Sequence, residues 1–235
     1  MKIAVIVPFY NESKNLPFFI NEWQLFLKKK SLQDNFFFFF IDDGSIDDSS
    51  RKIKKNIKSL KFKIIKKKNS GHGHTCRFGY RYIINKYKKF DYLMQIDSDN
   101  QCDPRYAFSF CNLMKKENCK FIFGYRKTRA DGFIRYIVSR IMSWVFFVKK
   151  FTYIKDLNTP YRLMKAKELR LILNIIDKKD KYKKIELFNS VLSYVIIQKY
   201  PINWIDINFR NRYSGNSKYN FLRMLLMFMN FIIKI

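Results

Sequence analysis

The chain has 235 residues, 48% of them hydrophobic and 18% aromatic, and its 47 Lys and Arg outnumber 19 Asp and Glu to give a formal net charge of +28. This apolar content excludes a disordered chain, and the length fits one large α/β domain or one domain with an appendage. The charge favours anionic lipid head groups, nucleic acid or phosphorylated substrates over acidic proteins as partners, although a biased genomic base composition also produces chains rich in Lys, Ile, Phe and Asn.

Strands and helices are expected to alternate through the first half of the chain. Residues 2–8 and 35–41 are apolar runs that predict buried parallel strands, and residues 13–30 carry apolar side chains at helical spacing, with Ser13 or Asn11 as the N-cap. The same reasoning predicts helices over 47–60 and 76–88 and strands over 62–65 and 92–96. Such alternation builds a parallel sheet that binds ligands outside the carboxyl ends of its strands. The polar clusters at residues 8–12, 42–45 and 97–101 are therefore predicted to meet at one edge.

The pattern loosens after about residue 105, where we expect a helix over 104–118, a strand over 120–125 and an amphipathic helix over 132–151. The last helix combines aromatic residues with Arg135, Arg140, Lys149 and Lys150, which suits a membrane-interface helix and equally suits core packing or a contact between protomers. The tail, residues 219–235, is apolar enough to require docking on its own domain, a partner or a membrane. Its longest uncharged apolar stretch is well short of the roughly 17 to 25 residues of a spanning helix.

Several other features predict structure rather than chemistry. Met1 leads straight into an apolar run without the basic leader of a signal peptide, so we expect no export. Four cysteines, at positions 76, 102, 111 and 119, show neither a CxxC pair nor a zinc spacing, which indicates reduced thiols in a cytosolic protein. The lysine triplets at 28–30 and 66–68 are expected to be solvated. His72 and His74 alternate with glycines ahead of a helix, and we expect a turn there rather than a metal site.

Asp97 and Asp99 follow directly after an apolar strand, which places two carboxylates together at the edge of the sheet. Like charges at this distance repel unless a cation neutralises them. Hard oxygen ligands favour Mg²⁺ or Mn²⁺, which in proteins typically also hold substrate phosphates. Gln101, two residues further on, is a candidate neutral oxygen ligand. The sequence therefore predicts a divalent metal site at this edge, made by Asp97, Asp99 and Gln101.

Four motifs occur in a characteristic order: PFYNE at residues 8–12, DDGSID at 42–47, DSDNQ at 97–101 and RYSGNSK at 212–218. Together they resemble family 2 glycosyltransferases of the GT-A fold, and more narrowly the dolichol-phosphate mannose synthase or polyprenyl-phosphate sugar transferase branch. The resemblance covers residues 1–218. It implies an α/β, Rossmann-like domain with a mainly parallel sheet, divided into a nucleotide-binding half (1–104) and an acceptor half (105–218), followed by the apolar tail (219–235) as a membrane-surface helix.

The resemblance also implies roles for individual residues on the donor side. Pro8, Tyr10 and Glu12 would line the nucleotide pocket, with Asp42 or Asp43 reading the base or ribose and Ser98 beside them. Asp97 and Asp99 would hold the metal on the donor diphosphate. The basic residues Arg126, Arg212 and Lys218 would face the phosphates, where negative charge grows as the nucleotide diphosphate departs.

On the acceptor side the match is partial. Where relatives commonly have a small residue this chain has Cys76, and where they have Gly-Phe-Arg it has Pro160, Tyr161 and Arg162, so that only Arg162 of the triplet is kept. Asp156 matches an acidic position near the acceptor. An attacking sugar hydroxyl needs a carboxylate base, for which Asp156 or Glu186 would be available, whereas a lipid phosphate is already largely ionised at neutral pH and needs only cations.

The chain lacks the paired Glu-Asp that hydroxyl-using relatives often carry near residues 183–187. We therefore predict an inverting transferase that moves a sugar from a nucleotide-diphosphate donor to a polyprenyl (dolichyl-like) phosphate at the cytoplasmic face of an anionic membrane, with Mg²⁺ or Mn²⁺ as cofactor. One alternative is transfer to a hydroxyl of a surface glycan such as lipopolysaccharide or capsule. Another is a non-catalytic basic module for membrane or nucleic acid, although no nucleic-acid-binding motif occurs. The sugar, the lipid and the oligomeric state cannot be read from these motifs.

Overall fold

The computed structural model describes residues 1–117, 119–129, 133–214 and 221–235. One seven-stranded sheet with the order β3-β2-β1-β4-β6-β5-β7 runs through it. The strands are β1 (Ile3–Phe9), β2 (Phe36–Asp42), β3 (Lys61–Lys66), β4 (Tyr92–Gln95), β5 (Phe121–Arg129), β6 (Arg162–Lys165) and β7 (Asn203–Phe209). All neighbouring strands are parallel except β6, which is antiparallel to both β4 and β5. The mainly parallel α/β sheet that the alternating pattern predicts is confirmed.

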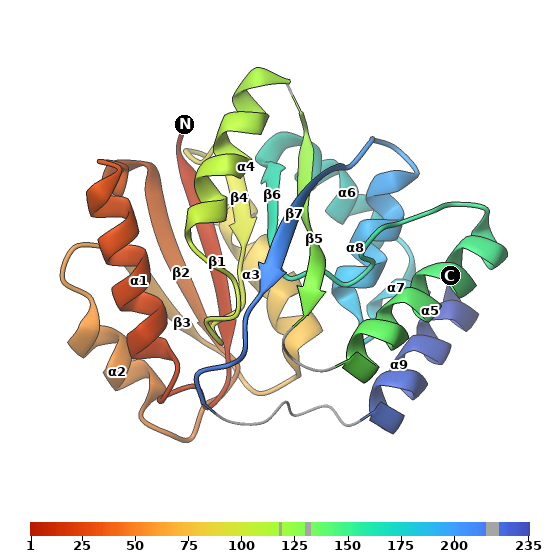
Figure 1. Cartoon of the computed structure of the whole chain (residues 1–235), viewed down its shortest axis with the longest axis horizontal. Coiled ribbons are helices and arrows are strands. Elements are labelled where there is room, and N and C mark those ends of the chain that lie inside the picture. Colours follow the sequence, from red (N-terminus) through yellow and green to blue (C-terminus); the bar gives the residue numbers. More distant parts are fainter. Residues whose placement is uncertain (118, 130–132, 215–220) are drawn as a thin grey trace.

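Helices cover both faces of this sheet (Figure 1). They are α1 (Leu16–Lys29), α2 (Ser49–Asn56), α3 (His72–Lys86), α4 (Arg105–Lys116), α5 (Phe133–Lys150), α6 (Ala166–Asp177), α7 (Asp180–Lys183), α8 (Phe188–Ile197) and α9 (Phe221–Lys234), with a short 3-10 turn at Gln33–Asn35. The buried residues of α1, α2 and α4 belong to one core, and those of α3, α6 and α8 belong to a second core on the opposite face of the sheet. The result is a three-layer α/β/α arrangement.

The run of five phenylalanines at 36–40 is explained by the interior position of β2, which lies between β3 and β1. Because successive side chains of a strand point to opposite faces, a strand covered on both sides needs apolar residues at every position. Phe38 packs against Trp23 of α1 on one face, with ring centroids 5.2 Å apart. Phe39 packs against Tyr87 and Phe90 on the other face, with centroids 5.2 and 5.7 Å apart. The phenylalanine run therefore supplies both cores.

Two predicted helix starts are wrong. Neither Ser13 nor Asn11 caps α1: the helix begins at Leu16 after Asn15, and the Asn11 backbone has a φ of 53° and belongs to a loop. α3 begins at His72, four residues earlier than expected. A Cβ on Gly73 would lie 1.9 Å from the backbone oxygen of Glu186, so glycine is required where α3 approaches the start of α8. This close approach is not visible in the sequence.

Two further expectations concern the apolar segments and the cysteines. Within the described part of the chain, none of the helices is long and apolar enough to cross a membrane. All four cysteines are free and buried, as expected for reduced thiols.

Candidate active site

The loops that follow β1 and β2 are held together by hydrogen bonds at the carboxyl edge of the sheet. The Asn11 backbone N–H donates to Ser45 Oγ at 3.0 Å, and the Ile46 N–H donates back to Asn11 Oδ1 at 3.0 Å. The Glu12 N–H donates to Ser49 Oγ at 2.8 Å. The loop after β4 joins the same edge because Arg212 contacts both Glu12 and Asp99. The predicted convergence of the three polar clusters is confirmed.

Asp97 and Asp99 lie at this edge directly after β4. Asp99 is buried, and this burial together with the charge of Asp97 raises its pKa to about 6. The Oδ1 atom of Asp97 is also buried and accepts no hydrogen bond from any described residue, although His72 Nε2 lies 3.5 Å away. An unsatisfied carboxylate oxygen beside a second, buried carboxylate is an unfavourable arrangement unless a cation joins it.

The segment 210–214 crosses the same edge and is tied down at both ends. The Arg210 N–H donates to the Gln101 backbone oxygen at 2.9 Å, and Gln101 Nε2 donates to the Arg210 oxygen at 2.8 Å. At the other end, the side chain of Asn15 exchanges two 3.0 Å hydrogen bonds with the backbone of Ser214. Between these ties, Arg212 Nη2 donates to Asp99 Oδ2 at 2.9 Å. This segment therefore places a guanidinium on the carboxylate pair.

The carboxylate pair fits a divalent cation in part. Its oxygens are the ligands that Mg²⁺ and Mn²⁺ prefer, and one of them is buried without a hydrogen bond. No group of three or more His, Cys, Asp and Glu side chains among the described residues forms a complete cage. Gln101 lies at the site, but its side chain is used by Arg210 and Arg212. A Mg²⁺ ion commonly keeps waters and substrate phosphates as its other ligands, so a two-carboxylate site that the donor completes is sufficient.

The remaining residues predicted to bind the donor lie near this edge, and their surroundings differ from one another. Pro8 is a buried strand residue paired with Ile41, Ser98 is buried beside Asp99, and Tyr10 is half-buried in the loop after β1. Both oxygens of the Asp42 carboxylate are engaged by the protein, one by the Ser45 N–H at 2.7 Å and one by Ser50 Oγ at 2.8 Å. The structure therefore shows Asp42 organising its own loop.

Asp43 is likewise used to hold a loop. Its carboxylate accepts hydrogen bonds from Lys67 Nζ at 2.6 Å and from the N–H groups of Ser70 and Gly71 at 2.9 Å each. Burial opposes ionisation, but the hydrogen bonds from Lys67, Thr75 and Ser70 outweigh it and lower the pKa of Asp43. Lys67 is thus not the solvated residue that its lysine triplet suggested. These contacts do not support the prediction that Asp43 reads the base, because its oxygens face the β3–α3 loop.

Replacement of Asp43 by asparagine is expected to lower the free energy of unfolding at pH 7 by about 1.5–3 kcal/mol, the range for hydrogen bonds to charged groups. A carboxylate whose pKa is lowered on folding adds stability above its unfolded pKa of 3.8 and loses it as pH falls through the folded value. The deficit of the variant should therefore shrink below about pH 4. Urea unfolding at pH 7 and pH 3.5 measures this, with Asp48→Asn as the exposed control, and an equal deficit at both pH values would contradict it.

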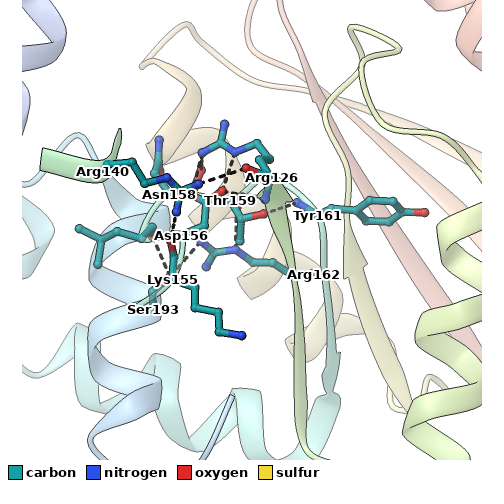
Figure 2. A network of polar contacts seen from close by, with 10 residues as sticks. Arg126, Arg140, Lys155, Asp156, Asn158, Thr159, Tyr161, Arg162 and Ser193 are labelled. Atoms are coloured by element: carbon teal, nitrogen blue, oxygen red, sulfur yellow. Dashed lines mark hydrogen bonds and ion pairs between the residues drawn. The ribbon is translucent and has the colours of Figure 1, made fainter. Parts of the chain in front are cut away.

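Arg126 and Asp156 form a buried ion pair (Figure 2). Arg126 Nε donates to Asp156 Oδ2 at 2.7 Å and Nη2 donates to Oδ1 at 2.8 Å, so both carboxylate oxygens are occupied. Arg126 Nη2 also reaches the Asn158 oxygen at 3.3 Å, and Arg140 donates to the Arg126 and Lys155 backbone oxygens at 3.1 Å. The predictions of a phosphate-facing Arg126 and of Asp156 as a base are therefore not supported in this state, because each neutralises the other.

The two predicted acceptor residues do not come together. Arg162 is fully buried: its Nε donates to the Thr159 oxygen at 2.8 Å, and its Nη2 donates to the Asn189 oxygen and to Ser193 Oγ. Burial lowers its pKa to about 10. The prediction that Arg162 meets an acceptor is wrong for this structure, because no part of its guanidinium is exposed. Glu186 is exposed ahead of α8, with Arg223 Nη2 3.9 Å from its carboxylate. Lys218 lies outside the described residues.

This geometry can be compared with known proteins. Residues 4–173 match the family described as Glycosyl transferase family 2. The chain belongs to this family. Its members are transferases of sugars, and the matched range includes Glu12, Asp97 and Asp99 of the carboxylate edge.

Solved structures show the same fold at low sequence identity. Mannosyl-3-phosphoglycerate synthase from Rubrobacter xylanophilus is 12% identical with a TM-score of 0.63, and the match covers 100% of this chain and 72% of that one. Glucosyl-3-phosphoglycerate synthase from Mycobacterium tuberculosis, in complex with Mn²⁺, uridine-diphosphate-glucose and phosphoglyceric acid, is 13% identical with a TM-score of 0.64, covering 99% and 79%. At such identity the likeness confirms the GT-A arrangement and says nothing about this chain's own ligands.

Two residues that hold the loops of this edge together were missed by sequence reasoning. Asn15 is buried, donates to Glu12 Oε2 at 2.6 Å and binds the Ser214 backbone, so it connects the β1 loop to segment 210–214. Lys67 anchors Asp43. Asn15 carried one weak signal, since it is a polar residue followed by a helix. Its actual partner lies 199 positions away, and no local pattern reveals that.

Proposed function

We propose that this family 2 glycosyltransferase moves a sugar from a nucleotide-diphosphate donor to a polyprenyl (dolichyl-like) phosphate, with inversion at the anomeric carbon. The observation that carries the proposal is that the Asp156 carboxylate is fully hydrogen-bonded to Arg126. A hydroxyl acceptor needs a carboxylate base, and both oxygens of Asp156 accept hydrogen bonds from Arg126. A phosphate acceptor is already largely ionised at neutral pH, so it needs no base.

Asp97 and Asp99 are proposed to hold Mg²⁺ or Mn²⁺. The ion, when bound, would neutralise negative charge on the diphosphate of the donor. Arg212 now donates to Asp99 and lies 3.8 Å from Glu12. Because Arg212 lies at the carboxylate pair, its guanidinium would be available to a diphosphate bound there. Lys218, six positions further along the same motif, is proposed to act with it.

The bond changes of this reaction require positioning rather than proton transfer. An oxygen of the lipid phosphate forms a bond with the anomeric carbon from the face opposite the diphosphate, and the bond from that carbon to the diphosphate oxygen breaks. The electron pair leaves with the nucleoside diphosphate. Preorganised positive charge at the leaving group, supplied by Arg212 on its tied segment, stabilises the transition state.

A second candidate is transfer to a hydroxyl, either of a small phosphorylated acceptor or of a surface glycan. It is favoured by the solved structures, which include a mannosyl-3-phosphoglycerate synthase and a glucosyl-3-phosphoglycerate synthase in complex with phosphoglyceric acid. Glu186 is the remaining predicted base, because its carboxylate is exposed and only loosely approached by Arg223. This candidate shares the donor site with the first and differs only in the acceptor.

One experiment separates the two. The protein is incubated with radiolabelled nucleotide sugars and either polyprenyl phosphate or 3-phosphoglycerate, with Mg²⁺, with Mn²⁺ or with EDTA. The expected result is a metal-dependent label that partitions into organic solvent. Label that appears only in a water-soluble product would overturn the lipid-phosphate proposal in favour of the hydroxyl acceptor. Equal transfer in EDTA would remove the metal from the proposal.

A further inference from the structure

Two helices of the second half, α5 and α9, are apolar on their outer as well as their inner faces. On the inside, Phe146 of α5 and Phe231 of α9 are fully buried and stack with ring centroids 6.0 Å apart. Figure 1 shows the two helices together at the end of the molecule opposite α1 and α2. Large apolar side chains on the outer side of a helix normally lie against protein or lipid. Here the outer side is exposed.

The exposed apolar side chains on the outer side of α5 and α9 make up what we name the α5/α9 face. On α5 and just after it, Ile141, Trp144, Val148 and Phe151 recur at intervals of three and four residues, which places them on one stripe of a helix. Trp144 is 65% exposed and Phe151 88% exposed. On α9, Leu226 is 61% and Ile233 73% exposed. Single exposed apolar residues are ordinary, but a cluster of this size marks a surface that binds something.

Positive charge surrounds the α5/α9 face. Lys149 and Lys150 of α5 donate hydrogen bonds to backbone oxygens of Ile232 and Ile235 in and after α9. Lys181 of α7 also reaches the Ile235 oxygen, and Lys234 of α9 reaches the Lys184 oxygen. Of the nearby acids, Asp180 is paired with Lys183, and Glu186 has Arg223 at 3.9 Å. The basic groups therefore dominate around an apolar surface.

The two helices of the α5/α9 face also follow shortly in sequence after segments of the carboxylate edge. α5 begins at Phe133, shortly after Arg126 and the end of β5, and α9 begins at Phe221, shortly after the tied segment that carries Arg212. Both helices thus continue from segments at the carboxyl ends of the sheet strands.

We propose that the α5/α9 face docks on an anionic lipid bilayer, with its aromatic and aliphatic side chains in the interface and its lysines among the head groups. Apolar burial plus attraction to anionic lipid is the combination that holds interfacial helices on membranes, and each lysine near the surface adds to the attraction. The benefit of this docking rests on the proposed function: if the acceptor is a lipid phosphate in the bilayer, docking brings the carboxylate edge to it. The docking is measured without any transfer of sugar.

The test is sedimentation of the whole chain with vesicles of phosphatidylcholine, either pure or containing about a third phosphatidylglycerol. We expect at least a roughly tenfold stronger partition onto the anionic vesicles, reduced by high salt. The double variant Trp144→Ser/Leu226→Ser should lose roughly tenfold of this partition, because exposed side chains contribute to lipid contact and little to folding. The matched control is Leu25→Ser, which changes an apolar residue that is 60% exposed on α1, and its partition should stay within about twofold.

Three outcomes would overturn the docking. The first is that the double variant partitions like the unchanged protein. The second is that the protein binds vesicles of pure phosphatidylcholine as well as it binds the anionic vesicles. The third is that the unchanged protein is a dimer that does not bind vesicles and that the double variant converts to a monomer. The last result would assign the α5/α9 face to a second copy of the chain. Failure of the proposed function is recognised separately: vesicles bind as expected, but no labelled lipid forms when polyprenyl phosphate is included.

Discussion

Replacement of Asp97 or Asp99 by alanine is expected to lower kcat/KM for sugar transfer by at least about 10²–10³-fold, the loss seen when one group that stabilises developing charge is removed. The reason is that the two carboxylates are the proposed ligands of the divalent ion, although Asp99 also accepts hydrogen bonds from Arg212 and from the Gln101 N–H. The Asp97 Oδ1 atom accepts no hydrogen bond from the described residues, and burial beside Asp97 raises the pKa of Asp99. Steady-state transfer assays over a range of Mn²⁺ concentrations measure the effect.

Asp97→Ala should fold at least as well as the unchanged protein, because it removes one of two like charges. Asp99→Ala also removes the acceptor of Arg212 and of the Gln101 N–H, and we expect it to be less stable by about 1–3 kcal/mol. Thermal unfolding measured beside the activity therefore separates a lost ligand from a damaged fold. The matched control is Asp48→Ala, which removes an exposed carboxylate paired with Arg51 and should leave activity within about twofold. Full activity in Asp97→Ala or Asp99→Ala at any metal concentration would contradict the metal assignment. A large fall in the unfolding temperature of Asp97→Ala would instead assign the pair to the core.

The fold of the first half was predictable because its signals are local. Apolar runs ended by Pro8, by Asp42 and by Asp97 gave three strands in the right order, and parallel topology then required their polar ends to meet. The N-cap of α1 was mispredicted because Asn11 and Ser13 have capping side chains, whereas the loop is held by Ser45 and Ser49 from the neighbouring strand connection. Tertiary hydrogen bonds overrode a local preference there.

In the second half the predicted helices at 104–118 and 132–151 and the strand at 120–125 are confirmed as α4, α5 and β5, but the sheet strands after residue 151 were not predicted. The antiparallel strand β6 is short, Arg162–Lys165, and its position between β4 and β5 is set by contacts across the sheet rather than by its own pattern. Arg162, Arg126 and Asp156 were assigned to phosphates and acceptor from motif position alone. Charge in a sequence does not show whether it is buried, and the structure pairs or encloses all three. The burial of these three side chains is the reason that their predicted roles are not supported.

Replacement of Asp156 by asparagine is expected to lower the free energy of unfolding by about 3–5 kcal/mol, the range for breaking a buried ion pair by removing one partner. Asparagine cannot neutralise the Arg126 guanidinium, which is held within the same buried network by the oxygens of Asp156 and Asn158. The double variant Arg126→Met/Asp156→Leu removes both charges and should recover most of the loss, because an apolar pair of similar volume needs no compensation. Urea unfolding of the double variant and of the single variants Arg126→Met and Asp156→Leu gives the coupling between the two residues.

The result also decides between two roles for Asp156. If Asp156 acts as a general base, the Asp156→Asn enzyme should have a kcat about 10²–10⁴-fold lower while its fold stays intact. If Asp156 instead neutralises a buried arginine, the variant protein should be less stable, and its folded fraction should keep most of its activity. Because both oxygens of Asp156 are hydrogen-bonded to Arg126, we expect the second pattern. Normal unfolding together with a specific loss of kcat would establish Asp156 as the base and favour the hydroxyl acceptor over the lipid phosphate.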